Sequence, residues 1–146
     1  MISLLLVLAF AAPPELPVIV AEVSSQCALS SLAVYSSGVA HIQESNTCQA
    51  GSDELTASLR KVTPAELRKL TAAIEAAHFD SLPTEIQPDP QEVSTDEDVF
   101  LIRVWRGGRS KLVRAYALGR AQDRDAAKCF QALWASLEDL GLPEVK

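Results

Sequence analysis

Three cysteines, two histidines and one run of carboxylates are the side chains of this 146-residue chain best suited to chemistry. His41 and His78 are the only imidazoles, and they cannot complete a structural zinc site without free cysteine ligands. A reactive thiol at Cys129 would need a neighbouring imidazole and a lowered pKa, and no local motif supplies them. We therefore expect Cys129 to act as a small hydrophobic residue, and neither histidine to have a direct chemical role.

Cys27 and Cys48 are the pair best placed for a disulfide. If the Ser-Gly dipeptide at 37–38 is a two-residue turn, the two cysteines lie equally far from it and face each other across a hairpin. They then occupy a non-hydrogen-bonded site, where facing Cα atoms are about 4.5 Å apart, within the range of a disulfide. A bulge that shifts the register would remove this match, so the other pairings with Cys129 stay open.

Carboxylates are concentrated at residues 89–98. Oxygen ligands of this kind suit Ca²⁺, but the spacing differs from an EF-hand loop and the required glycine is missing. The segment is typical of a solvated acidic loop. A hydrolase or cation-dependent enzyme that uses it is the alternative hypothesis. A deep pocket lined by Asp96, Asp98 or His78 would favour that alternative.

Common catalytic motifs are absent from the sequence, including Gly-x-Ser-x-Gly, His-Glu-x-x-His and Cys-x-x-Cys. The Gly-Gly segment at 105–110 resembles a phosphate loop, but it lies between two expected strands rather than before a helix. We therefore predict no catalytic residue, no metal site and no cofactor. The net charge of −6, from 13 basic and 19 acidic residues, argues against a nucleic-acid partner.

The elements that position these residues follow from periodicity and turn signals. β-branched runs predict strands at 17–23, 29–36 and 39–43, and a further strand is expected at 55–62. A capping box that begins at Thr63 predicts a helix from there to about His78. A second amphipathic helix is expected from Asp123 to Leu140. The expected fold is α+β: an antiparallel sheet of two hairpins plus an N-terminal strand, with both helices packed on one face.

The second expected hairpin joins strands 99–106 and 110–118 through the Gly-Gly turn at 107–108. One of its faces is apolar and typical of a core. The other carries Arg103 and Trp105 beside Arg114 and Tyr116, which are residue types enriched at binding hot spots. We take these four residues as a candidate interaction surface, unless a helix or loop covers this face.

Residues 1–11 form an uncharged apolar run that ends in an Ala-x-Ala box and is followed by Pro13 and Pro14. This layout is typical of a secretory signal peptide. The run is too short to cross a bilayer, so we expect no membrane span after its removal. We expect residues 12–146 to form a single α+β domain that is periplasmic or secreted. An oxidising compartment permits the Cys27–Cys48 bridge.

The layout of the chain resembles a family of small exported bacterial proteins of unknown function. The resemblance rests on a cysteine before a Tyr-containing hairpin, a capped helix with a His-Phe-Asp-Ser-Leu end, a Thr-Asp step before the second hairpin, and an aromatic closing helix. These features lie at Cys27, 33–38, 76–82, Thr95-Asp96, and Phe130, Leu133 and Trp134. The resemblance implies no activity. The leading hypothesis is a non-catalytic exported domain that binds a protein or another envelope component.

Overall fold

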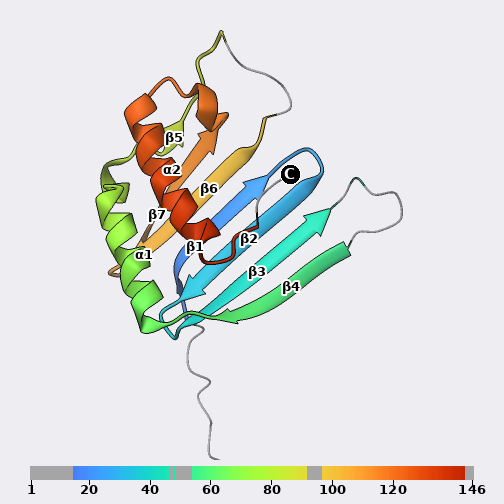
Figure 1. The fold of residues 1–146 in the computed structure, drawn as a ribbon. Helices are drawn as coiled ribbons and strands as arrows, with labels where there is room; N and C mark the ends of the chain where they lie inside the picture. Colours follow the sequence, from blue (N-terminus) through green and yellow to red (C-terminus); the bar gives the residue numbers. More distant parts are fainter. Residues whose placement is uncertain (1–14, 47, 49–53, 92–96, 144–146) are drawn as a thin grey trace, which may run out of the picture.

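Seven strands and two α-helices lie in the described part of the computed structural model, which comprises residues 15–46, 48, 54–91 and 97–143. They are β1 (Pro17–Ser24), β2 (Ala28–Tyr35), β3 (Val39–Asn46), β4 (Glu54–Lys61), α1 (Pro64–Ala76), β5 (Glu85–Ile86), β6 (Val99–Arg106), β7 (Arg109–Tyr116) and α2 (Arg124–Glu138), with short 3-10 helices at Phe79–Ser81 and Leu118–Arg120. The strands form one sheet in the order β4-β3-β2-β1-β6-β7-β5 (Figure 1).

The predicted α+β class is confirmed, but the sheet is larger than two hairpins plus an N-terminal strand. The fourth strand expected at 55–62 is present as β4, which extends the sheet beyond β3. β5 pairs with β7 in parallel, so the sheet is not wholly antiparallel. A strand of two residues is too short to show any hydrophobic period, which is why the sequence did not reveal it.

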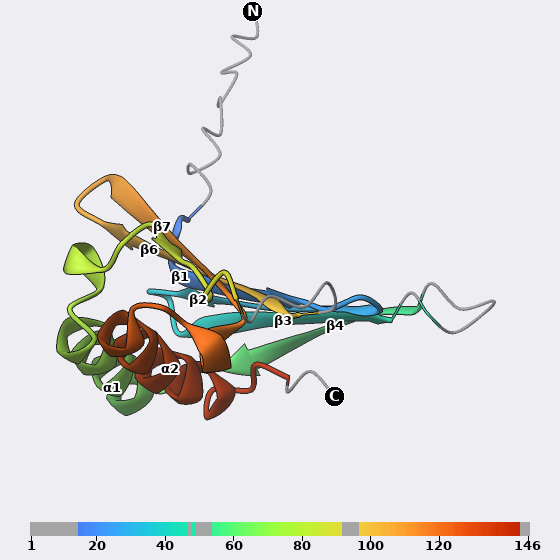
Figure 2. The ribbon, with the colours of Figure 1, turned by 90° about the horizontal axis from the view of Figure 1, so that it is seen from above.

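Both helices cover the same face of the sheet, as predicted (Figure 2). The core lies between the helices and the central strands. On β1, Ile19, Ala21 and Val23 alternate with partly exposed residues and are at most 1% exposed. Phe130 of α2 is also fully buried. Alternation along the strands thus assigns one face to the core and leaves the other face uncovered by either helix.

The start of α1 is fixed by a capping box, as the sequence indicates. The Thr63 side chain accepts from the Glu66 backbone N–H, and the Glu66 carboxylate accepts from the Thr63 backbone N–H at 2.7 Å. This backbone hydrogen bond lowers the pKa of Glu66, and the Thr63 hydroxyl and Arg60 lower it further. Arg60 of β4 pairs with Glu66 at 2.6 Å and donates to the Leu140 carbonyl at 2.7 Å. One arginine therefore links β4 to the start of α1 and the end of α2.

The second hairpin has the predicted register. Gly107 and Gly108 have φ of +55° and +76°, as a two-residue primed turn requires. Arg106 faces Arg109 next to the turn, and Val99 faces Tyr116 at the far end. The two faces of this hairpin are therefore divided as expected.

The first hairpin differs by one residue from its predicted register. Gly38 has φ of +81° and donates to the Tyr35 carbonyl, so the loop has three residues rather than two. Val34 then faces Ala40, and the ladder ends where Ala28 faces Asn46. The prediction that the cysteines face each other within the ladder is therefore wrong. A single glycine after two serines favours a three-residue loop closed by a bulge.

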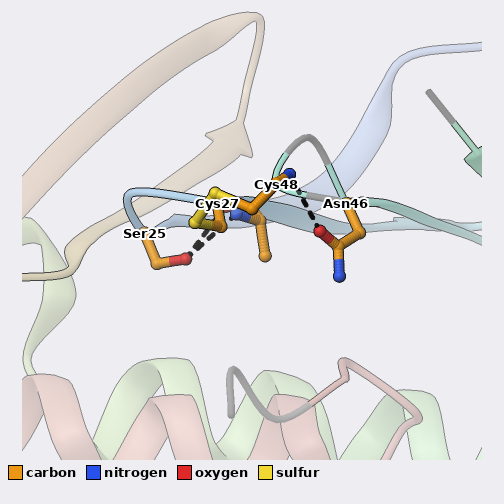
Figure 3. Close-up of a disulfide and its surroundings, with 5 residues drawn as sticks. Ser25, Cys27, Asn46 and Cys48 are labelled. Carbon is orange, nitrogen blue, oxygen red and sulfur yellow. Dashed lines mark hydrogen bonds between the residues drawn. A yellow bond between two sulfur atoms is a disulfide. The ribbon is translucent and has the colours of Figure 1, made fainter. Parts of the chain in front are cut away.

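The Cys27–Cys48 disulfide is nevertheless present, just outside this ladder (Figure 3). Its Cα atoms are 4.9 Å apart. If the ladder continued, the residue before Cys48 would face Cys27. Cys48 therefore lies one residue too far along the chain to be an in-register partner. The Asn46 side chain accepts from the Cys48 backbone N–H at 3.1 Å. The bridge closes the open end of the hairpin, where the backbone ladder has stopped.

Removing the bridge should destabilise the fold. The chain-entropy model gives about 3 kcal/mol for a bridge between residues 21 positions apart. We expect the Cys27→Ala/Cys48→Ala variant to lose about this much free energy of unfolding in a urea titration without reductant. Cys129→Ala is the matched control, because it removes a thiol and no bridge. Equal losses in the two variants would contradict a stabilising role for the bridge.

Candidate interaction surface

The face of the sheet that points away from α1 and α2 is called the open face here. Its side chains alternate with the buried ones along each strand. One row of facing residues crosses six strands from β7 to β4. The row consists of Leu112, Arg103, Val20, Ala33, His41 and Leu59. These residues are half-buried or exposed, so the row forms a continuous surface of mixed apolar and basic character.

All four residues of the predicted surface lie on the open face. Arg103 and Trp105 alternate with the buried Ile102 and Val104 on β6. Arg114 faces Leu101, and Tyr116 faces Val99 across the hairpin. The hairpin register therefore makes Arg103 and Arg114 diagonal neighbours, whereas Trp105 lies near the turn and Tyr116 at the far end of the same face. Neither α1 nor α2 covers this face (Figure 2).

Arg103 and Trp105 form a cation–π pair. The guanidinium carbon lies 5.7 Å from the centroid of the indole ring. Arg103 is exposed and Trp105 is half-buried, so part of the ring and most of the cation face solvent. Such a pair holds two long side chains in one arrangement before any partner arrives, which reduces the entropy lost on binding.

A second aromatic pair on the open face was not anticipated. The rings of Tyr35 on β2 and His41 on β3 lie 5.0 Å apart and are tilted by 51°. On the same face, Leu29 of β2 is 47% exposed, and Leu55 and Leu59 of β4 are 65% and 72% exposed. Leu59 faces His41 directly. The alternating pattern of strands 29–36, 39–43 and 55–62 places these residues on one face of their strands. The pattern does not show that this face is continuous with the face that carries Arg103, because that depends on β1 pairing with both β2 and β6.

The acidic segment is engaged in local contacts. Glu97 pairs with Arg120 at 3.0 Å. Burial raises the pKa of Asp98, and the charge of Glu97 raises it further. Residues 92–96, which include Asp96, lie outside the described residues. Within the described ranges, no group of three His, Cys, Asp or Glu side chains could hold a metal ion.

A cavity of about 300 Å³ lies beside this segment, at the start of α2. Its wall includes Asp89 together with Arg120, Arg124 and Lys128, but neither Asp98 nor His78. The cavity is therefore mainly basic, and its described lining lacks Asp98 and His78, two of the three residues by which the enzyme alternative would be recognised. It gives that alternative no support.

The remaining candidates lie apart from the open face. His78 is exposed and has φ of +47° at the turn that follows α1. Cys129 of α2 is half-buried and packs against the core, as expected of a small hydrophobic residue. In the part of the chain that the structure describes, no helix has the length and apolar character needed to cross a membrane. The expected signal peptide at residues 1–11 lies outside that part.

Comparison with protein-family models finds no family that matches this chain, and comparison with curated proteins finds no significant match.

The position of Asp98 gives a pH prediction. Burial disfavours its ionised form, so at neutral pH the charged carboxylate subtracts stability, and this cost disappears as the pH falls through the raised pKa. We expect Asp98→Asn to unfold at a higher urea concentration than the native protein at neutral pH. The difference should shrink toward zero in acid. An advantage that is the same at both pH values would show that ionisation of Asp98 is not its cause.

Proposed function

We propose that this chain is an exported, non-catalytic domain that binds a protein partner through the open face of its sheet. The observation that carries the proposal is that the Arg103–Trp105 pair, Arg114 and Tyr116 lie along one face of the hairpin, which neither helix covers. Trp, Tyr and Arg are the residues that most often dominate the free energy of protein–protein binding.

The fold itself does not require this combination of side chains. The core is complete on the helix side, where Ile102, Val104, Val113 and Ala115 of the same hairpin are at most 2% exposed. Polar residues on the open face would serve solubility better than a half-exposed tryptophan and a series of leucines. A binding role accounts for their presence.

Export is the second part of the proposal. The Cys27–Cys48 disulfide supports it, because structural disulfides persist mainly in oxidising compartments. The sequence of residues 1–11 supports it independently. The periplasm or the cell exterior would then be the place where the open face meets its partner.

Site-specific photo-crosslinking would test the binding surface. A benzophenone amino acid at Leu112, which faces Arg103 on the open face, should give discrete protein adducts when the chain is produced in its native envelope. The same probe at Ala72, exposed on α1, is the positional control. We expect adducts from Leu112 and none of the same mass from Ala72.

Two further variants separate the surface from general effects. Removal of a hot-spot residue weakens binding by about 2 kcal/mol, or roughly 30-fold. When Arg103→Ala and Trp105→Ala are combined with the probe at position 112, the yield of protein adducts should therefore fall by at least about tenfold. Arg68→Ala, on the exposed side of α1, should leave it unchanged. Adducts that survive the double substitution, or that form equally from Ala72, would overturn the proposed surface.

Export has its own direct test. The intact mass of the protein recovered from the envelope should correspond to a chain that begins at Ala12. One thiol, Cys129, should react with a labelling reagent before reduction, and all three cysteines should react after it. A full-length chain that begins at Met1 and has three reactive thiols in the cell interior would refute export.

A further inference from the structure

The two edges of the sheet are built differently. β5 has only two residues, and Pro83 and Pro88 flank it. β4 has eight residues, contains no proline and, among the described strands, pairs with β3 alone (Figure 1). A long edge strand presents unpaired N–H and C=O groups that can accept a further strand. β4 is therefore the edge at which the sheet can be extended.

The side chains of β4 strengthen this contrast. On the helix side, Arg60 is held by Glu66 and by the Leu140 carbonyl, so the strand is fixed in place. On the open face, Leu55 and Leu59 are 65% and 72% exposed. Natural edge strands usually carry charges or prolines that prevent pairing. The charged residues of β4 lie at its ends, and the uncharged stretch between them carries two exposed leucines suited to an apolar contact.

The sequence of β4 is complementary to itself about Ala57. When two copies of one strand pair antiparallel, facing side chains lie on the same side of the sheet. The two-fold axis then passes between one residue and its own copy, and residues equally far from that residue on either side face each other. With Ala57 facing its own copy, the facing pairs are Leu55 with Leu59 and Thr56 with Ser58. Leucine thus meets leucine, and hydroxyl meets hydroxyl.

Neighbouring registers lose this match. An axis at Ser58 would place Leu55 opposite Lys61, and an axis at Thr56 would place Leu55 opposite Ala57. From residue 55 to residue 59, leucine faces leucine and hydroxyl faces hydroxyl only when Ala57 faces its own copy. Cross-strand pairs of this kind stabilise a sheet, whereas mismatched pairs do not.

We propose that β4 pairs with β4 of a second copy of this chain, antiparallel and with the two-fold axis at Ala57. The dimer joins the two sheets into one, buries the four leucines against each other in two pairs, and makes the two open faces continuous. This inference uses Leu55 and Leu59 of the open face but neither Arg103 nor Trp105, so the two proposals can be tested separately.

Cysteine crosslinking tests the register directly. In a Cys129→Ser background, Ala57→Cys would face its own copy and should form a disulfide-linked dimer on mild oxidation. Leu55→Cys and Leu59→Cys should each give none alone, because each faces the other position. An equal mixture of these two variants should crosslink, since Leu55 and Leu59 then meet across the axis.

Sedimentation measures the association without a crosslink. We expect the native protein to have twice the mass of one chain, and Leu59→Lys to have the mass of one chain with unchanged helix content. Trp105→Ala should remain dimeric, which separates this result from the open-face proposal. A native monomer, or crosslinking that is equal at positions 55, 57 and 59, would overturn the β4 pairing.

Discussion

The packing of both helices on one side of the sheet is the constraint on which the other features depend. β1 lies at the centre and pairs with β2 on one side and β6 on the other. Its buried side chains therefore join the two hairpins and meet α2 through a single core. The contact between Phe100 of β6 and Trp134 of α2, edge to face at 4.9 Å, anchors the second hairpin to the helices. Because α1 and α2 cover one face, every second residue of each strand lies on the other face. That face therefore carries the side chains that the core does not need.

Two local devices hold the distant edge of this one-sided structure. The disulfide closes the β2–β3 hairpin at the end where its ladder stops. Arg60 connects β4 to the capping carboxylate of Glu66 and to the Leu140 carbonyl in the turn that follows α2, so the edge strand is fixed from the helix side. Both devices act on the half of the sheet formed by β2, β3 and β4. They hold its open face and its β4 edge in a defined geometry.

Much of this arrangement could be predicted from local chemistry. Two consecutive glycines supply both positive φ values of a primed turn, so the register of the second hairpin and the face that carries Arg103 and Trp105 followed directly. The first hairpin offers only Gly38 at its turn, and a one-residue error in loop length shifted the whole ladder. The cysteine pairing was nevertheless right, because Cys48 lies beyond the last ladder pair and is not bound to its register. The contribution of β3 and β4 to the open face depends on contacts between separate hairpins, which no local pattern specifies.

Side-chain footprinting with hydroxyl radicals tests most directly whether the open face is both free and functional. Trp105 and Trp134 are matched reporters, since one lies on the open face and the other is 7% exposed in the core. In the isolated protein, Trp105 should be modified readily and Trp134 should be protected. In the complex with the crosslinked partner, Trp105 should become protected as well. Equal protection of both tryptophans in the isolated protein, or modification of Trp105 that does not change in the complex, would contradict the account.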